Sequence, residues 1–175
     1  LSVTALFSCY AQAHQGTGKV TFTGEVIDAP CSIKPGDEDL KVNLGEVSTT
    51  ILNSGSNSLA EDFTIHLQDC ILTDGTGTVT NDKVKVTFTS ANTYTGQTDL
   101  LKNICEGNMG AASNVGVRIL DSGNGVVALG TAVEISFPNT SSYQELNFKA
   151  RMEAPTKTAT IGDVYAEANY VLDYK

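Results

Sequence analysis

Few side chains in this chain could carry out catalysis or bind a metal. Its histidines and cysteines are His14, His66, Cys9, Cys31, Cys70 and Cys105. His66 lies in a strand-like run, where a surface or hydrogen-bonded histidine is more common than a catalytic base. A copper or zinc site on a β-sandwich needs a cluster of imidazoles, which two histidines do not supply. We therefore predict no metal site.

The sequence also gives little indication of nucleophilic catalysis. Cys105 and His66 would form a reactive couple only if folding happened to bring them together, and no third residue is indicated to orient the histidine. The sequence has neither a Gly-x-Ser-x-Gly turn nor a glycine loop that cradles phosphate. We therefore predict that the protein is not an enzyme, with no catalytic residues and no cofactor.

The cysteines have a structural use in an oxidising compartment. Cys31 and Cys70 each stand at the edge of a strand-like run, and a disulfide between them would stabilise the fold by about 4 kcal/mol on the chain-entropy model. Cys105 is then left over, as a buried or a reactive thiol. The sequence alone leaves Cys105 open as a partner for either of the other two.

The first thirteen residues predict export. Residues 1–13 carry no charge and end in Ala11-Gln12-Ala13, the small-x-small pattern of a signal-peptide cleavage site. Because they lack a basic start, we interpret them as the end of a signal peptide, with His14 as the first mature residue; a short buried strand or helix is the alternative. No other stretch approaches the 18 apolar residues of a membrane span.

The charge balance excludes some classes of partner. The chain has 11 Lys and Arg against 20 Asp and Glu, a net charge of −9. Binding to nucleic acid or to an anionic membrane surface requires clustered basic residues, which are missing here. We therefore expect no nucleic-acid partner, and we interpret the acidic surface as a source of solubility.

Short strand-like runs separated by turn-forming residues make up the rest of the chain. The runs are Lys19–Asp28, Leu40–Leu44, Asp62–Cys70, Asp82–Ser90, Ser113–Asp121, Val126–Leu129, Ala132–Phe137, Tyr143–Glu153 and Asp163–Tyr174. Only Thr98–Cys105 is predicted to form a short helix. Many short strands at such intervals predict one all-β domain, a sandwich of antiparallel sheets.

Both ends of the chain have unusual strand patterns. At the carboxyl end, Ala168, Tyr170, Leu172 and Tyr174 alternate with polar or exposed positions up to the terminal residue, so the chain ends inside a strand whose far edge needs a partner. Near the amino end, one face consists of Gly16, Gly18, Val20, Phe22, Gly24 and Val26. Glycine weakens a strand unless something approaches closely, which suggests that this face fits a groove. Taken alone, the segment is better explained as a plain amphipathic first strand.

Together these features resemble the subunits of chaperone–usher pili, such as the rod subunits of type 1 and P pili. The resemblance rests on the leader ending in Ala-Gln-Ala, the segment Gly16–Cys31, the runs Phe63–Cys70 and Asn114–Asp121, Gly162 at the fourteenth position from the carboxyl end, and the penultimate Tyr174. It spans nearly all of the mature chain.

The resemblance implies an immunoglobulin-like sandwich that lacks its seventh strand. Residues 1–13 would be the partial signal peptide, 14–26 an amino-terminal donor-strand extension and 27–175 the pilin domain. A periplasmic chaperone would fill the open groove during export, and at an outer-membrane usher the extension of the next subunit would replace the chaperone strand. Neighbouring identical or related subunits, the chaperone and the usher are the implied partners.

The same resemblance assigns roles to residues. The donor stripe would be Gly16, Gly18, Val20, Phe22, Gly24 and Val26. The acceptor side would contain Gly162, Ala168, Tyr170, Leu172, Tyr174 and the carboxylate of Lys175, which the chaperone would grip. Cys31 and Cys70 would form the family disulfide, whereas Cys105 departs from the pattern and receives no role.

The function expected from this resemblance is structural. The chain would be exported through the periplasm to the cell surface and polymerise by donor-strand exchange into the rod of a fimbria that supports cell adhesion. A minor tip or adaptor subunit is the second interpretation, and a stand-alone carbohydrate-binding sandwich is a third. A two-domain tip adhesin is excluded because the mature chain is too short and carries a donor segment.

Overall fold

Alternating apolar residues produce the strands of this fold, and the computed structural model describes residues 18–175. The predictions for residues 1–13, His14 and Gly16 lie outside the described residues. The elements are β1 (Ser32–Ile33), η1 (Asp37–Asp39), α1 (Thr49–Asn53), β2 (Glu61–Gln68), β3 (Lys83–Thr89), β4 (Thr93–Tyr94), β5 (Gln97–Lys102), β6 (Gly116–Asp121), β7 (Ala132–Ser136), β8 (Gln144–Glu153) and β9 (Asn169–Tyr174).

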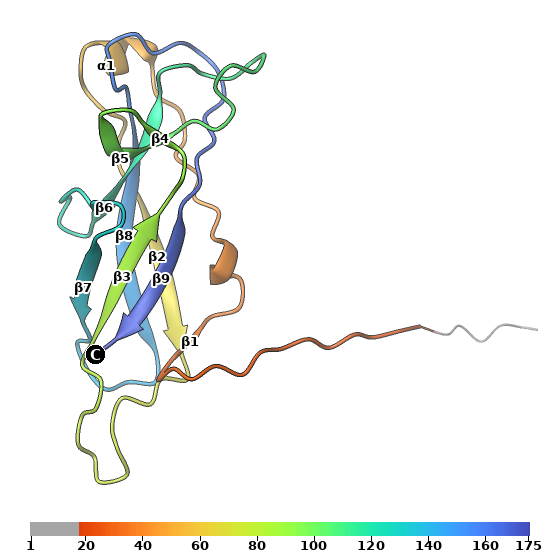
Figure 1. Cartoon of the computed structure of the whole chain (residues 1–175), viewed down its shortest axis with the longest axis vertical. Helices are drawn as coiled ribbons and strands as arrows, with labels where there is room; N and C mark the ends of the chain where they lie inside the picture. The colour runs from red at the N-terminus through yellow and green to blue at the C-terminus, as the bar shows by residue number, and fades with distance from the viewer. Residues whose placement is uncertain (1–17) are drawn as a thin grey trace, which may run out of the picture.

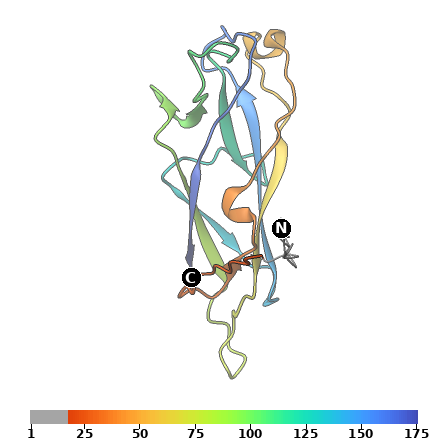
Figure 2. The same ribbon diagram turned by 90° about the vertical axis from the view of Figure 1, so that its right-hand side faces the viewer.

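The strands form two sheets that pack face to face (Figures 1 and 2). One sheet has the order β1-β2-β8-β6-β5-β4 and the other the order β7-β3-β9. Every neighbouring pair is antiparallel. The mostly β architecture of antiparallel sheets therefore agrees with the prediction.

The core lies between the two sheets. Every second residue of β8 is buried, and every second residue of β3 likewise, as the period of a strand requires. Phe88 of β3 meets Phe148 of β8 edge to face, with the ring centroids 4.9 Å apart. Phe63 of β2 stacks on Phe148 with the ring centroids 5.7 Å apart and meets Phe88 edge to face at 6.3 Å. These three aromatic rings join the two sheets.

The predicted helix at Thr98–Cys105 is wrong. Residues Gln97–Lys102 form β5, in which Leu100 pairs with Arg118 and Leu101 with Val117 of β6. Both leucines are buried, one on each face of the sheet, so their adjacency in sequence imitated a helical pattern. Pairing with β6 stabilises the strand by more than the weak helical preference of these residues stabilises a helix. The α-helix among the described residues is α1, a single short element capped by the Ser48 hydroxyl.

Three predicted strand runs form no ladder. Residues 19–28 and 40–44 are extended without strand pairing, and Val126 makes only an isolated bridge to Leu120. The last run is also shorter than predicted, since residues 164–168 are extended but unpaired and only β9 continues as a strand. Three of these unpaired segments, 19–28, 40–44 and 164–168, belong to the amino-terminal extension or border β9, which places them at the candidate site.

Candidate functional site: a groove beside the last strand

β9 is the edge strand of the smaller sheet. It pairs with β3 along one side, from Asn169 opposite Thr89 to Tyr174 opposite Val84. The inward residues of β3 are at most 3% exposed, whereas Tyr170, Leu172 and Tyr174 of β9 face the same core and remain half-buried. The core is therefore incompletely covered along the outer side of β9.

An apolar groove follows this uncovered side. It has a volume of about 190 Å³ and is lined by Ile27, Ala29, Cys31, Ile33, Tyr170, Leu172 and Tyr174. The two tyrosines stay neutral at physiological pH, because burial and the nearby carboxylates of Asp37 and Glu38 raise the pKa of Tyr170 to about 12. Burial, with Tyr170 beside it, raises the pKa of Tyr174 to about 12. The groove can thus accept apolar side chains.

Two further segments near β9 lack strand pairing, residues 40–47 and 164–168, and the second of them leads directly into β9. Lys41 lies close enough to Tyr165 and Glu167 for their charges to interact, so the two segments run near each other. Within the described part of the chain, no backbone hydrogen bond to another backbone group involves residues 40–47, and in 164–168 only Tyr165 makes one. A strand placed between these segments would find free donors and acceptors on both sides.

A larger hollow of about 400 Å³ lies beside β7 and β8. Three carboxylates, those of Asp121, Glu134 and Glu145, are among its lining residues. An apolar segment bound there would remove these charges from water without pairing them, which is unfavourable. We therefore place the candidate site at the groove beside β9.

Gly162 and Asn103 fix the beginning of the last segment. Gly162 has φ 142°, and a side chain on it would overlap the backbone of residues 110–112. Next to it, the Asp163 amide donates to the Gly110 carbonyl at 2.9 Å. The buried Asn103 side chain donates to the Asp163 carbonyl at 2.9 Å and accepts from the Tyr165 amide at 3.0 Å. The predicted position Gly162 is thus a close backbone contact, whereas Asn103 was missed because no sequence pattern marks it.

A second polar cluster, around Asp37, joins η1 and β2 to β9. The Asp37 carboxylate accepts the His66 amide at 2.6 Å and lies 2.7 Å from His66 Nδ1. The Tyr170 hydroxyl donates to the Asp37 carbonyl at 2.9 Å. His66 is therefore a hydrogen-bonded histidine, as predicted, and Asp37 connects β2, the turn η1 and a residue that lines the groove.

Acid should weaken this cluster. Burial raises the Asp37 pKa, but the hydrogen bonds from His66 and the charges of His66 and Lys34 outweigh burial, so the pKa lies below its ordinary value of 3.8. A depressed folded-state pKa stabilises the fold above pH 3.8, and this stabilisation is lost as pH falls through the folded value. We expect urea midpoints to drop more between pH 7 and pH 3 in the wild type than in Asp37→Asn. Equal drops would contradict this role.

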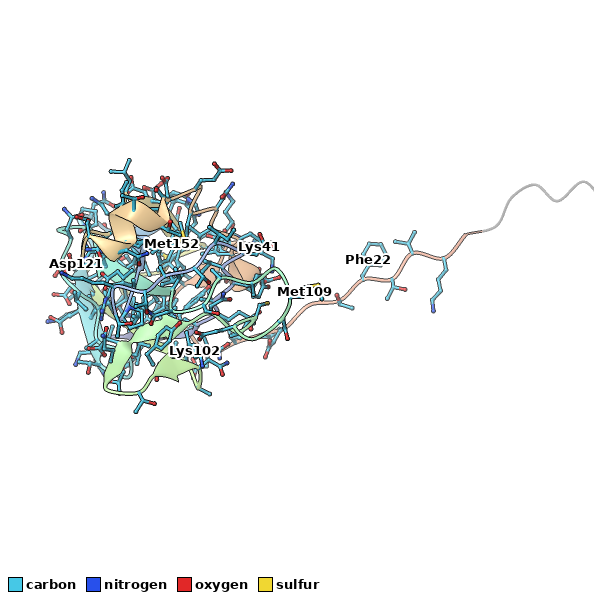
Figure 3. The ribbon with its side chains drawn as sticks, turned by 90° about the horizontal axis from the view of Figure 1, so that it is seen from above. Phe22, Lys41, Lys102, Met109, Asp121 and Met152 are labelled. Atoms are coloured by element: carbon cyan, nitrogen blue, oxygen red, sulfur yellow. A yellow bond between two sulfur atoms is a disulfide. The ribbon has the colours of Figure 1, made fainter. Side chains whose placement is uncertain are left out.

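The amino-terminal extension projects away from the body (Figures 1 and 3). Val20, Phe22 and Val26 are 74%, 89% and 100% exposed, and the positions of a Cβ at Gly18 and Gly24 meet no atom within 4 Å. Figure 3 shows Phe22 far from the packed side chains. The structure therefore does not bring the described donor residues together with the acceptor residues of the same chain.

The root of the extension, residues 27–31, and the carboxyl terminus are both held in place by bonds to the body. The Cys31–Cys70 disulfide, which the resemblance implied, joins the root to the end of β2, and Cys105 is a free thiol. A terminal oxygen of Lys175 accepts the Asp82 amide at 2.9 Å and the Lys83 amide at 3.3 Å. The end of β9 is therefore held against β3.

Two other kinds of site were sought within residues 18–175. No group of three or more His, Cys, Asp or Glu side chains gathers there in a way that could hold a metal ion. None of the helices in this part of the chain has the length and apolar character needed to cross a membrane.

Comparison with known sequences decides the family. The sequence pattern described as "Fimbrial protein" matches residues 20–175. The chain belongs to the fimbrial protein family. This fimbrial protein is 64% identical to the uncharacterized fimbrial-like protein YgiL of Escherichia coli (strain K12). The alignment extends over 173 residues, which are 99% of this chain and 93% of YgiL. It is 36% identical to the major MR/P fimbria protein of Proteus mirabilis (strain HI4320), over 93% of this chain and 87% of that protein.

Solved structures agree with the family. A chain from a chaperone–usher pilus structure has a TM-score of 0.71 and 28% identity, covering 95% of this fimbrial protein and all of that chain. The P pilus rod subunit PapA has a TM-score of 0.67 and 27% identity, covering 84% of this fimbrial protein and all of PapA. The resemblance to chaperone–usher pilus subunits is therefore confirmed. Members of this family are structural, non-enzymatic proteins of surface fimbriae.

Proposed function

We propose that this fimbrial protein is a rod subunit that polymerises by donor-strand exchange. Its body, residues 27–175, is an immunoglobulin-like sandwich without a seventh strand, and residues 14–26 are the donor-strand extension. The observation that carries the proposal is the apolar groove beside β9, together with the exposure of Val20, Phe22 and Val26 in the described part of the extension. The extension of a second copy supplies the missing strand.

The groove and the extension are chemically complementary. The exposed Val20 and Phe22 alternate with threonines, as in a strand that presents one apolar face. Burial of each of the two apolar side chains stabilises the assembled pair by about 1.5–3 kcal/mol. Backbone hydrogen bonds to β9 and to residues 40–47 add affinity, since both edges have free donors and acceptors.

Assembly before export to the surface requires temporary protection of the groove. A half-covered core with unpaired edges favours aggregation, so a periplasmic chaperone lends a strand and an outer-membrane usher replaces it with the next subunit. Ala168, Tyr170, Leu172 and Tyr174 form the contact strand, and the carboxylate of Lys175 is the handle for basic residues of the chaperone. Similarity to the major MR/P fimbria protein supports the rod over the tip. The proposal includes export through the periplasm and support of cell adhesion.

A donor peptide tests this proposal. We expect a synthetic peptide of residues 14–28 to bind the subunit whose own residues 14–26 are deleted, and to raise its urea midpoint strongly, because the peptide completes the core. Circular dichroism against urea measures the midpoint. The matched control is the same peptide with Phe22→Asp, which removes the main apolar anchor. Equal midpoints with and without the unmodified peptide would reject strand acceptance.

Electron microscopy then separates the rod from the tip. An antibody against an epitope inserted in the exposed turn around Gly123 should label filaments along the whole shaft if the subunit forms the rod. Labelling only at filament ends would assign the protein to the tip or to an adaptor position. The turn is suited to an insertion because residues 122–125 are exposed and lead from β6 to β7, and β7 lies on the opposite side of β3 from β9.

A further inference from the structure

Two clusters of exposed apolar side chains lie at separate places on the body. The root cluster consists of Ile27, Ile71 and Val79, of which Ile71 is 72% exposed. The mouth cluster consists of Ile104, Met109 and Ile161, and its Met109 is fully exposed. Exposed apolar groups gathered beside a binding groove mark contact surfaces more often than isolated ones do.

The root cluster is held where the extension leaves the body. The Ile71 amide donates to the Pro30 carbonyl at 2.8 Å, and the neighbouring Cys70 is bonded to Cys31. Val79 is positioned by an isolated bridge to Thr73. The disulfide and the hydrogen bond therefore make the position of Ile71 relative to the extension a fixed property of each subunit.

The mouth cluster lies beside the beginning of residues 163–168, the segment that leads into β9. The Ile104 amide donates to the Tyr165 carbonyl at 2.9 Å. Met109 and Ile161 precede Gly110 and Gly162, whose backbones touch. Figure 3 shows Met109 and Lys41 on the side of the body from which the extension leaves. This cluster therefore stands at the end of the groove that is remote from Tyr174.

The occupied end of the groove fixes the direction of an incoming strand. Ile27 and Ala29, which belong to the root of the same chain, already line the groove beside Tyr170, Leu172 and Tyr174. A donor strand parallel to β9 would bring the root of the incoming copy to that same place, where the two roots would collide. An antiparallel donor brings the incoming root to residues 163–168 and produces a head-to-tail polymer.

Resting on the proposed function, we propose that the root cluster of a second copy of this chain docks onto the mouth cluster. Consecutive subunits would then share an apolar contact between their bodies in addition to the inserted strand. Antiparallel insertion places Ile71 of the incoming copy near Met109 and Ile161 of the copy that receives it. The contact removes from water the apolar side chains that each isolated subunit exposes.

Cysteine cross-linking tests the contact directly. We expect Ile71→Cys together with Met109→Cys, in a Cys105→Ser background, to give disulfide-linked ladders after polymers are oxidised, heated in denaturant until polymers without cross-links dissociate into monomers, and run under non-reducing conditions. Each single-cysteine variant is the matched control and should give no ladder. Polymers of normal length without cross-links in the double variant would overturn the proposal.

A charge substitution provides a second, independent test. We expect Met109→Lys with Ile161→Lys to slow incorporation of a full subunit at least about tenfold, because two charges would enter the contact. Insertion of the residue 14–28 peptide should stay within about twofold of wild type, since the peptide lacks Ile71 and Val79 of the root cluster. Equal slowing in both assays, or none in either, would overturn the contact. Failure of the peptide to bind the unsubstituted subunit would instead reject the proposed function.

Discussion

Replacing Phe22 with aspartate should abolish polymerisation while leaving the body of the subunit folded as in the wild type. Phe22 is 89% exposed and touches no part of its own domain, so the change costs the isolated subunit little. In the groove of a neighbour it would remove an anchor of about 1.5–3 kcal/mol and bury an unpaired carboxylate. We expect at least about a hundredfold loss of incorporation, measured as the yield of denaturant-resistant ladders.

Thr23→Asp is the matched control for this prediction. Thr23 is the adjacent residue of the extension and projects from its opposite face, so the same charge is added without entering the groove. We expect normal ladders from this variant and normal chaperone-bound yields from both. Filaments of wild-type length from Phe22→Asp would show that the donor stripe is not the part of the extension that binds.

Strands that alternate between core and solvent could be predicted from the sequence. The runs predicted at Asp62–Cys70, Asp82–Ser90 and Tyr143–Glu153 correspond to β2, β3 and β8 within one or two residues. In β3 every second residue is apolar and buried, and in β2 and β8 the same alternation places Ile65, Leu146 and Phe148 in the core, so the pattern and the packing agree. The sheet order could not be predicted in this way, because it depends on pairings between distant segments such as β6 with β8.

Segments 19–28 and 40–44 show why an extended pattern does not guarantee a strand. Their residues alternate as in β2, but a strand exists only where a neighbour supplies hydrogen-bond partners. Among residues 18–175 of one copy, no backbone group hydrogen-bonds to the backbone of either segment. The alternation in residues 19–28 and 40–44 therefore indicates strands that, on our proposal, pair only when a second chain is present.

The polar contacts that shape the groove could not be predicted. Asp37 follows a proline-glycine pair and resembles a solvated turn, yet its carboxylate is buried against His66. Asn103 lies within the run Thr98–Cys105 that resembled a helix, and its side chain joins the segments that contain Ala112 and Asp163. Both residues act through partners at least nine positions away, and a single sequence gives no sign of such contacts.

Gly162→Ala should be the most damaging of the small substitutions in the body. The methyl group would overlap the backbone of residues 110–112, which is held in place by hydrogen bonds from Asp163 and Asn103. The φ of 142° is also unfavourable for any residue with a Cβ. Overpacking and backbone strain together should cost about 2–6 kcal/mol of unfolding free energy. Urea unfolding of the subunit filled with the residue 14–28 peptide measures this loss.

Gly130→Ala separates the overlap from the strain. Gly130 has φ 78°, but a Cβ there meets no atom within 4 Å, so only the backbone conformation is disfavoured. The expected cost is about 1–2 kcal/mol. Because Gly162 immediately precedes residues 163–168, which lead into the groove-lining strand β9, Gly162→Ala should also slow peptide insertion, whereas Gly130→Ala should not. Equal losses of stability and unchanged insertion in both variants would mean that the close contact at Gly162 neither supports the body nor shapes the groove.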